Sequence, residues 1–143
     1  MKFPPRKPFY SSITIIILLP ALIFVLNIAL LISLGMKTID ENKIDKFFHL
    51  FGAVSAYFSA AGVLWHLVHR QIIELQNAYV FRALVFGFVC FVVIGWEILE
   101  YIVNIGPEFL TYSDTITDMI CGIVGGLFAM LFFRKLALGT KSS

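Results

Sequence analysis

The chain has 143 residues, of which 59% are hydrophobic and 14% are charged. Because a soluble domain carries about 25% charged residues, this composition excludes a water-soluble globule. The net charge of +2 is small and dispersed along the chain, which excludes the clustered basic surface of a nucleic-acid-binding protein. One spanning helix needs about 20 apolar residues, so we expect an all-α integral membrane protein with four transmembrane helices and a single domain over residues 1–143.

Four apolar segments follow one another along the chain. The first covers about residues 11–36 and is too long for the apolar core of a signal peptide, so we expect it to be retained. Pro20 lies inside it, and a membrane helix tolerates such a proline when a neighbour satisfies the freed carbonyl group. The other spans are predicted at about residues 47–69, 82–105 and 115–133, with polar connections between them.

Lys and Arg residues are distributed unequally between the two sides of the membrane that these spans define. Eight of the eleven lie at the two ends of the chain or in the second connection, and three lie in the first connection. The positive-inside rule therefore predicts cytoplasmic termini and an up-down four-helix bundle in a lipid bilayer. Trp65 and Trp96 lie near the predicted boundaries and are typical of an interfacial aromatic belt.

Ionisable residues occur near the predicted outer ends of three spans. Asp45 and His49 begin the second span and share one helix face because they are four residues apart. At a rise of about 1.5 Å per residue, Glu97 and Glu100 lie roughly 22 and 27 Å above the inner end of the third span. By the same rise, Asp118 lies roughly 24 Å above the inner end of the fourth. We therefore expect these side chains to meet in one layer below the outer surface.

Ionisable side chains inside a span usually face the bundle interior, where they pair, relay protons or bind ions. In an enzyme acting on a lipid-derived or envelope substrate, Glu97 or Glu100 would be the catalytic general base. This oxygen-rich set favours a divalent cation such as Mg, Mn, Ca or Zn over a thiolate-selected metal. The predicted metal ligands are His49, Glu97, Glu100 and Asp118, with Asp45 and Asp114 in support.

The same residues fit two other classes of function. A proton- or cation-coupled transporter, expected to be a homo-oligomer because four short helices enclose little volume, would need a water path from Glu97 past Gly87. A structural or assembly protein would use the polar groups as interhelical hydrogen bonds. Lys46 could neutralise the acids, but a lysine near a helix end is expected to extend its ammonium group to the surface.

Small residues predict which helix faces pack together. Gly122 and Gly126 follow Asp118 with the GxxxG spacing that allows two helices to approach closely. Gly87 and Cys90 lie below Glu97 on the third span, which predicts that the acidic side of that helix is also its packed side.

Two segments resemble known membrane protein families. DKFFHLFG at residues 45–52 resembles the start of a helix in VanZ-like proteins, and GWEILEY followed by YSDTITDM resembles YjdF-type inner membrane proteins. In the YjdF-type family a Glu-x-x-Glu helix precedes an Asp-Thr-x-x-Asp segment that opens a glycine-containing span. The matching residues here are Glu97, Glu100, Asp114, Thr115 and Asp118. The resemblance covers residues 45–130 and implies a polytopic protein of the bacterial inner membrane, of undefined activity.

Overall fold

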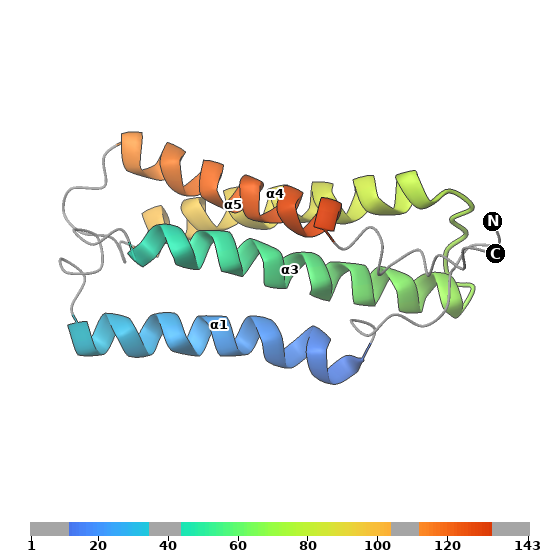
Figure 1. The fold of residues 1–143 in the computed structure, drawn as a ribbon, viewed down its shortest axis with the longest axis horizontal. Helices are drawn as coiled ribbons and strands as arrows, with labels where there is room; N and C mark the ends of the chain where they lie inside the picture. The colour runs from blue at the N-terminus through green and yellow to red at the C-terminus, as the bar shows by residue number, and fades with distance from the viewer. Residues whose placement is uncertain (1–11, 35–43, 104–111, 133–143) are drawn as a thin grey trace.

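The computed structural model describes residues 12–34, 44–103 and 112–132. It contains four helices, α1 (Ile13–Leu34), α3 (Ile44–His69), α4 (Ala78–Val103) and α5 (Tyr112–Phe132). Successive helices run in opposite directions, so the beginnings of α3 and α5 lie at the same end of the molecule as the end of α4 (Figure 1). The predicted all-α fold with four helices is therefore confirmed for the described part of the chain.

Three of these helices are long and apolar enough to cross a membrane, over Ile44–His69, Ala78–Ile102 and Tyr112–Phe132. In α1, the described residues contain a shorter apolar stretch, Ile16–Asn27. Many large apolar side chains are exposed, as lipid-facing residues would be, including Phe91 at 73% and Ile102 at 72%. The chain is thus a multi-pass membrane protein, and a fourth crossing through α1 stays a prediction.

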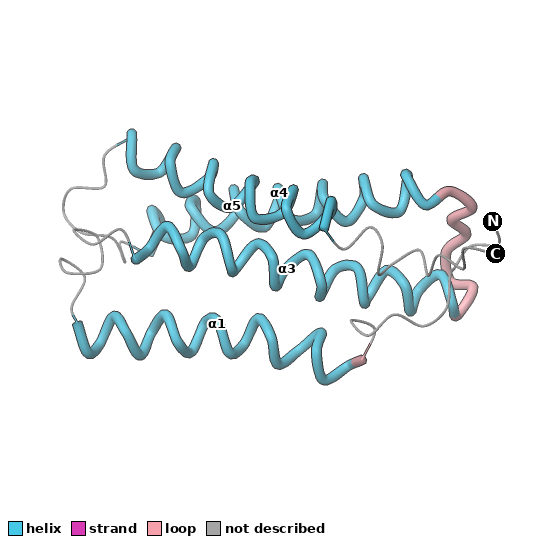
Figure 2. Tube along the Cα trace, viewed as in Figure 1, coloured by secondary structure: helices cyan, strands magenta, loops and turns pink. Residues whose placement is uncertain are grey.

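Helix α4 begins at Ala78, four residues before its predicted span, because a capping group, rather than the last charged residue, determines where this helix starts. Asn77 precedes α4, and its side-chain oxygen accepts a 2.7 Å hydrogen bond from the Tyr79 N–H, which is the geometry of an N-cap. At the other end of the connection, Gln71 has a φ of 58°, and the Ile72 N–H donates to the Leu67 carbonyl at 3.0 Å. This is a Schellman motif. It closes α3 and leaves a short connection to α4 (Figure 2).

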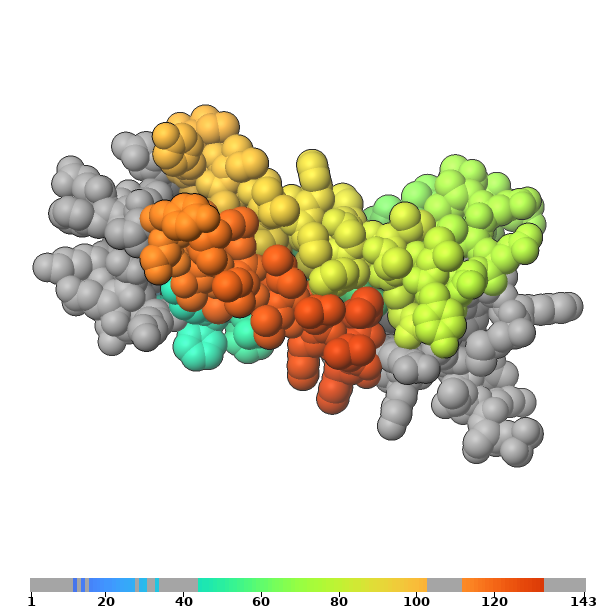
Figure 3. Space-filling model, turned by 90° about the horizontal axis from the view of Figure 1, so that it is seen from above, coloured from blue at the N-terminus to red at the C-terminus, as the bar shows by residue number. Residues whose placement is uncertain are grey.

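The α3–α5 and α4–α5 interfaces depend on the glycines of α5. A Cβ atom at Gly125 would collide with the backbone carbonyl oxygen of Leu50 on α3. A Cβ atom at Gly122 would lie 2.8 Å from Val93 Cγ2 on α4. The predicted close packing at the GxxxG spacing is confirmed, because α5 contacts both neighbours and lies beside α4 on the face shown in Figure 3.

The packed face of α4 differs in part from the prediction. Glu97 is on the packed side as expected, at 8% exposure, but Gly87 is exposed and has no atom within 4 Å of a Cβ position. Instead, side chains at four-residue spacing fill the interface, namely Phe81, Val85, Val89 and Val93. The glycines of α5 leave space that branched side chains fill, so the two helices pack glycine against valine rather than glycine against glycine.

Helix α1 packs against α3, and among the described residues it makes no close backbone contact with α4 or α5. The Ser59 hydroxyl on α3 donates a 2.8 Å hydrogen bond to the Ile16 carbonyl of α1. This is the carbonyl four residues before Pro20, whose missing N–H leaves it without a helical partner. The prediction that a neighbouring helix satisfies this group is confirmed. The packing is less symmetrical than a four-helix bundle, because α3, α4 and α5 form a core that α1 flanks.

Candidate functional site

Ionisable side chains from three helices meet at one end of the core. Helix α3 supplies three from its first two turns, α4 supplies two from its last two turns, and α5 supplies two from its first two turns. We call this set the polar cluster, and its members are Asp45, Lys46, His49, Glu97, Glu100, Asp114 and Asp118. All the residues predicted from the sequence as catalytic, metal-binding or supporting groups lie in it.

Lys46 forms ion pairs with both acids of α5. Its Nζ atom lies 2.5 Å from Asp114 Oδ1 and 2.5 Å from Asp118 Oδ1, and it donates a hydrogen bond to Asp114. The Lys46 side chain is 18% exposed and that of Asp118 is 3% exposed. Charge attraction is strong where water is largely excluded, so this interaction ties the first turns of α3 and α5 together. We call these three residues the lysine triad.

The expectation that Lys46 extends to the surface is therefore wrong. Its two partners lie four residues apart, on one face of α5, and that face turns toward α3. The spacing of Asp114 and Asp118 is a sequence signal for such a shared partner, because residues at i and i+4 are neighbours on a helix surface.

Both ring nitrogens of His49 face carboxylates. His49 Nδ1 lies 3.3 Å from Glu97 Oε1, and His49 Nε2 lies 3.5 Å from Asp45 Oδ2. The side chains of His49 and Glu97 are 7% and 6% exposed. A carboxylate behind one ring nitrogen fixes the ring orientation and leaves the other nitrogen for a ligand. Asp45 thus supports His49, and His49 Nδ1 faces Glu97.

Glu100 completes a compact group with these two residues. Ligand atoms of His49, Glu97 and Glu100 all lie within 4.8 Å of one another, and the same holds for Asp45, His49 and Asp118. We call His49, Glu97 and Glu100 the glutamate site. Asp118, the fourth predicted ligand, is ion-paired with Lys46 instead of being grouped with the two glutamates.

Trp96 has a role in the site that the sequence interpretation missed. Its Nε1–H donates a 2.6 Å hydrogen bond to Glu100 Oε1, and its ring contacts Phe24 of α1 edge to face, with the centroids 6.2 Å apart. The four-residue spacing of Trp96 and Glu100 is the signal that could have indicated this hydrogen bond. Assignment of Trp96 to an aromatic belt missed its polar partner.

The charges of the glutamate site are not balanced within the described residues. Glu97 Oε1 and Asp118 Oδ1 are buried without a hydrogen bond, but only Asp118 has an ammonium group beside it. No Lys or Arg in the described segments forms an ion pair with Glu97 or Glu100. Burying a carboxylate is costly unless a proton or a cation compensates it. The glutamate site can therefore bind a cation or hold and release a proton.

The interior below the polar cluster is apolar. Buried residues there include Val85, Val89, Ala61 and Ala129, and the buried polar or charged residues of the described chain are Ser55, Glu97 and Asp118. Gly87, past which a transporter's water path was expected, is exposed on the surface of α4 and does not line the interior of the described helices.

No protein-family model matches the sequence, and no curated protein or solved structure matches the chain. The side chains of the polar cluster themselves are therefore what supports a function.

Proposed function

We propose that this multi-pass membrane protein binds a divalent cation at the glutamate site. The observation that carries the proposal is the approach of an imidazole and two carboxylates from two helices within 4.8 Å, with Glu97 Oε1 buried and without a hydrogen bond. A cation there would neutralise the two glutamates, which have no lysine partner among the described residues, unlike Asp118.

The ligand types point to Mn²⁺ or Zn²⁺ ahead of Mg²⁺ and Ca²⁺. An imidazole nitrogen suits Zn²⁺, carboxylate oxygens suit Mn²⁺, and Mg²⁺ and Ca²⁺ prefer oxygen ligands alone. Asp45 would hold the His49 ring in place through Nε2, because a carboxylate beside the far nitrogen of a metal-binding histidine fixes the orientation of its ring. In catalysis, whichever of Glu97 and Glu100 is not bound to the cation would act as the general base on water or on a lipid-derived or envelope substrate.

The proposal also covers the membrane in which the chain lies and its orientation there. We place the chain in the bacterial inner membrane as a YjdF-type protein with partial VanZ-like resemblance, with α1 as the fourth crossing and both termini in the cytoplasm. The polar cluster then lies below the outer surface, where a site can be reached from outside the cell. The unequal distribution of Lys and Arg supports this orientation.

Metal content of purified, detergent-solubilised protein tests the cation site. After incubation with Zn²⁺ or Mn²⁺ and removal of free metal, elemental analysis of the unaltered chain should give close to one ion per chain. The double variant Glu97→Gln with Glu100→Gln keeps the size of both side chains and should lose the ion.

Glu74→Gln is the matched control, because Glu74 is an exposed glutamate in the connection between α3 and α4. It should retain the metal. Equal metal content in the double variant and the control, or none in the unaltered chain, would disprove the cation site.

A further inference from the structure

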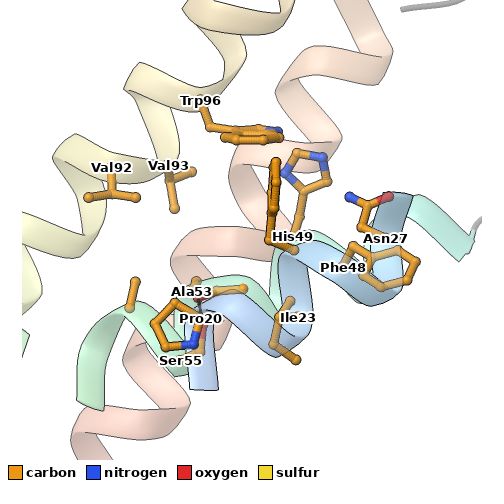
Figure 4. Close-up of a pocket in the computed structure, with 13 residues that line it drawn as sticks. Pro20, Ile23, Asn27, Phe48, His49, Ala53, Ser55, Val92, Val93 and Trp96 are labelled. Carbon is orange, nitrogen blue, oxygen red and sulfur yellow. Dashed lines mark hydrogen bonds between the residues drawn. The ribbon is translucent and has the colours of Figure 1, made fainter. Parts of the chain in front are cut away.

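A cavity of about 260 Å³ lies between α1, α3 and α4 (Figure 4). Its walls are almost entirely apolar and come from all three helices. The apolar wall residues include Pro20, Ile23, Ala53, Ala56, Val92 and Val93. Because the walls offer few polar partners, the cavity suits an apolar occupant.

One end of the cavity reaches the glutamate site. His49 and Trp96 line the cavity, and Figure 4 shows both at the same end of it, with Asn27 nearby. His49 also belongs to the glutamate site, and Trp96 donates a hydrogen bond to Glu100. A molecule in the cavity therefore lies directly beside the proposed cation ligands.

The cavity opens toward the side of the molecule. Among the described residues, the backbone of α1 lies close to α3 but not to α4, and the ring contact between Phe24 and Trp96 bridges α1 and α4. Two residues of the cavity wall, Phe24 of α1 and Val92 of α4, are 49% and 36% exposed. Val92 lies well inside the candidate span Ala78–Ile102, so the opening faces hydrocarbon rather than water.

We infer that this cavity binds one aliphatic chain of a membrane phospholipid and thereby brings the lipid headgroup to His49, Glu97 and Glu100. Its volume is slightly below the roughly 300–1,000 Å³ of pockets that enclose a drug-sized ligand, so it encloses part of one chain. The inference deepens the proposed function and rests on it, because a cation at the glutamate site is what would attract the phosphate group.

Gly52 offers a way to fill the cavity without disturbing the core. It lines the cavity, and no atom lies within 4 Å of a Cβ position there. Gly52→Leu should therefore place its side chain in the cavity. Gly87→Leu is the matched control, because Gly87 also has open space at its Cβ position but is exposed on the surface of α4 and does not line the cavity.

Photo-crosslinking in vesicles tests the inference. The probe is phosphatidylglycerol with a diazirine group on one acyl chain, mixed into vesicles that contain the full-length protein, and mass spectrometry locates the labelled residues. We expect labelling of Ala56 and Val93 in the unaltered chain. That labelling should fall by roughly tenfold in Gly52→Leu, which occupies the space, and should persist in Gly87→Leu.

The inference is overturned if the unaltered chain shows no labelling of these walls, or if Gly52→Leu is labelled like Gly87→Leu. Metal content of the same samples separates this failure from failure of the proposed function. Cavity labelling that responds to Gly52→Leu in a chain that binds no metal would support the lipid cavity and refute the cation site. Metal binding by a chain whose labelling is unchanged by Gly52→Leu would support the cation site and refute the lipid cavity.

Discussion

The lysine triad and the glutamate site lie side by side in one polar cluster, but they differ in how their charge is compensated. In the lysine triad, one ammonium group contacts two carboxylates and joins α3 to α5. In the glutamate site, two carboxylates share one imidazole, which also faces Asp45. Each carboxylate of the lysine triad has an ammonium group beside it, whereas in the described part of the chain neither carboxylate of the glutamate site has a Lys or Arg partner. Both groups contain buried carboxylates. The comparison therefore distinguishes carboxylates that form a structural ion-pair network from carboxylates that form a candidate binding site.

The largest expected effect is on stability, from breaking the lysine triad. Lys46→Met removes the shared cation and leaves the buried Asp118 carboxylate unpaired. Removing one partner of a buried ion pair costs about 3–5 kcal/mol, and we expect about 3 kcal/mol because Lys46 and Asp114 keep some solvent contact. Thermal or denaturant unfolding in detergent measures the loss.

Lys46→Arg is the control for this variant, since it keeps the positive charge and should lose less stability. Adding Asp118→Asn to Lys46→Met should recover part of the loss, because it removes the unpaired charge. If Lys46→Met has the same unfolding temperature as the unaltered chain, the triad does not hold α3 and α5 together.

The second expected effect is specific to the glutamate site. At a free Zn²⁺ or Mn²⁺ concentration about 100 times the Kd, binding should stabilise the unaltered chain by about 2.7 kcal/mol. The increase should appear as a higher unfolding temperature and should be reversed by a chelator. In the double variant Glu97→Gln with Glu100→Gln the increase should vanish. An equal increase in that variant would place the cation elsewhere.

The smallest expected effect concerns the hydrogen bond that orients Glu100. Trp96→Phe removes the Nε1–H donor while keeping an aromatic ring beside Phe24. Loss of a group that orients a metal ligand by a hydrogen bond lowers metal affinity by about 10–100-fold, and we expect about tenfold because Glu97 and His49 remain. Metal titration measures it. Trp65→Phe, at the other end of α3, should leave the affinity unchanged, and a matching loss there would indicate a general packing effect.

The depth of the acidic residues could be predicted from the sequence, but their partners could not. Each helix rises by a fixed amount per residue, so Glu97, Glu100 and Asp118 could be placed in one layer before any contact was known. Lys46 has a long, flexible side chain that can reach water or either neighbour, and its partners depend on how α5 is rotated. The prediction that Gly87 lies on the packed face of α4 was wrong for the same reason. Which face of α4 packs depends on how its valines fit against the glycines of α5.

By itself, the sequence determined an all-α membrane chain, its apolar segments and the level at which its ionisable residues lie. These follow from composition and from backbone hydrogen bonding, which are local properties. Only the tertiary structure decided that Lys46 of α3 pairs with two acids of α5, that His49 joins two glutamates, and that a cavity lies beside them between α1, α3 and α4. Those features arise where side chains distant in the sequence pack against one another, and small rotations of a helix change which of them meet.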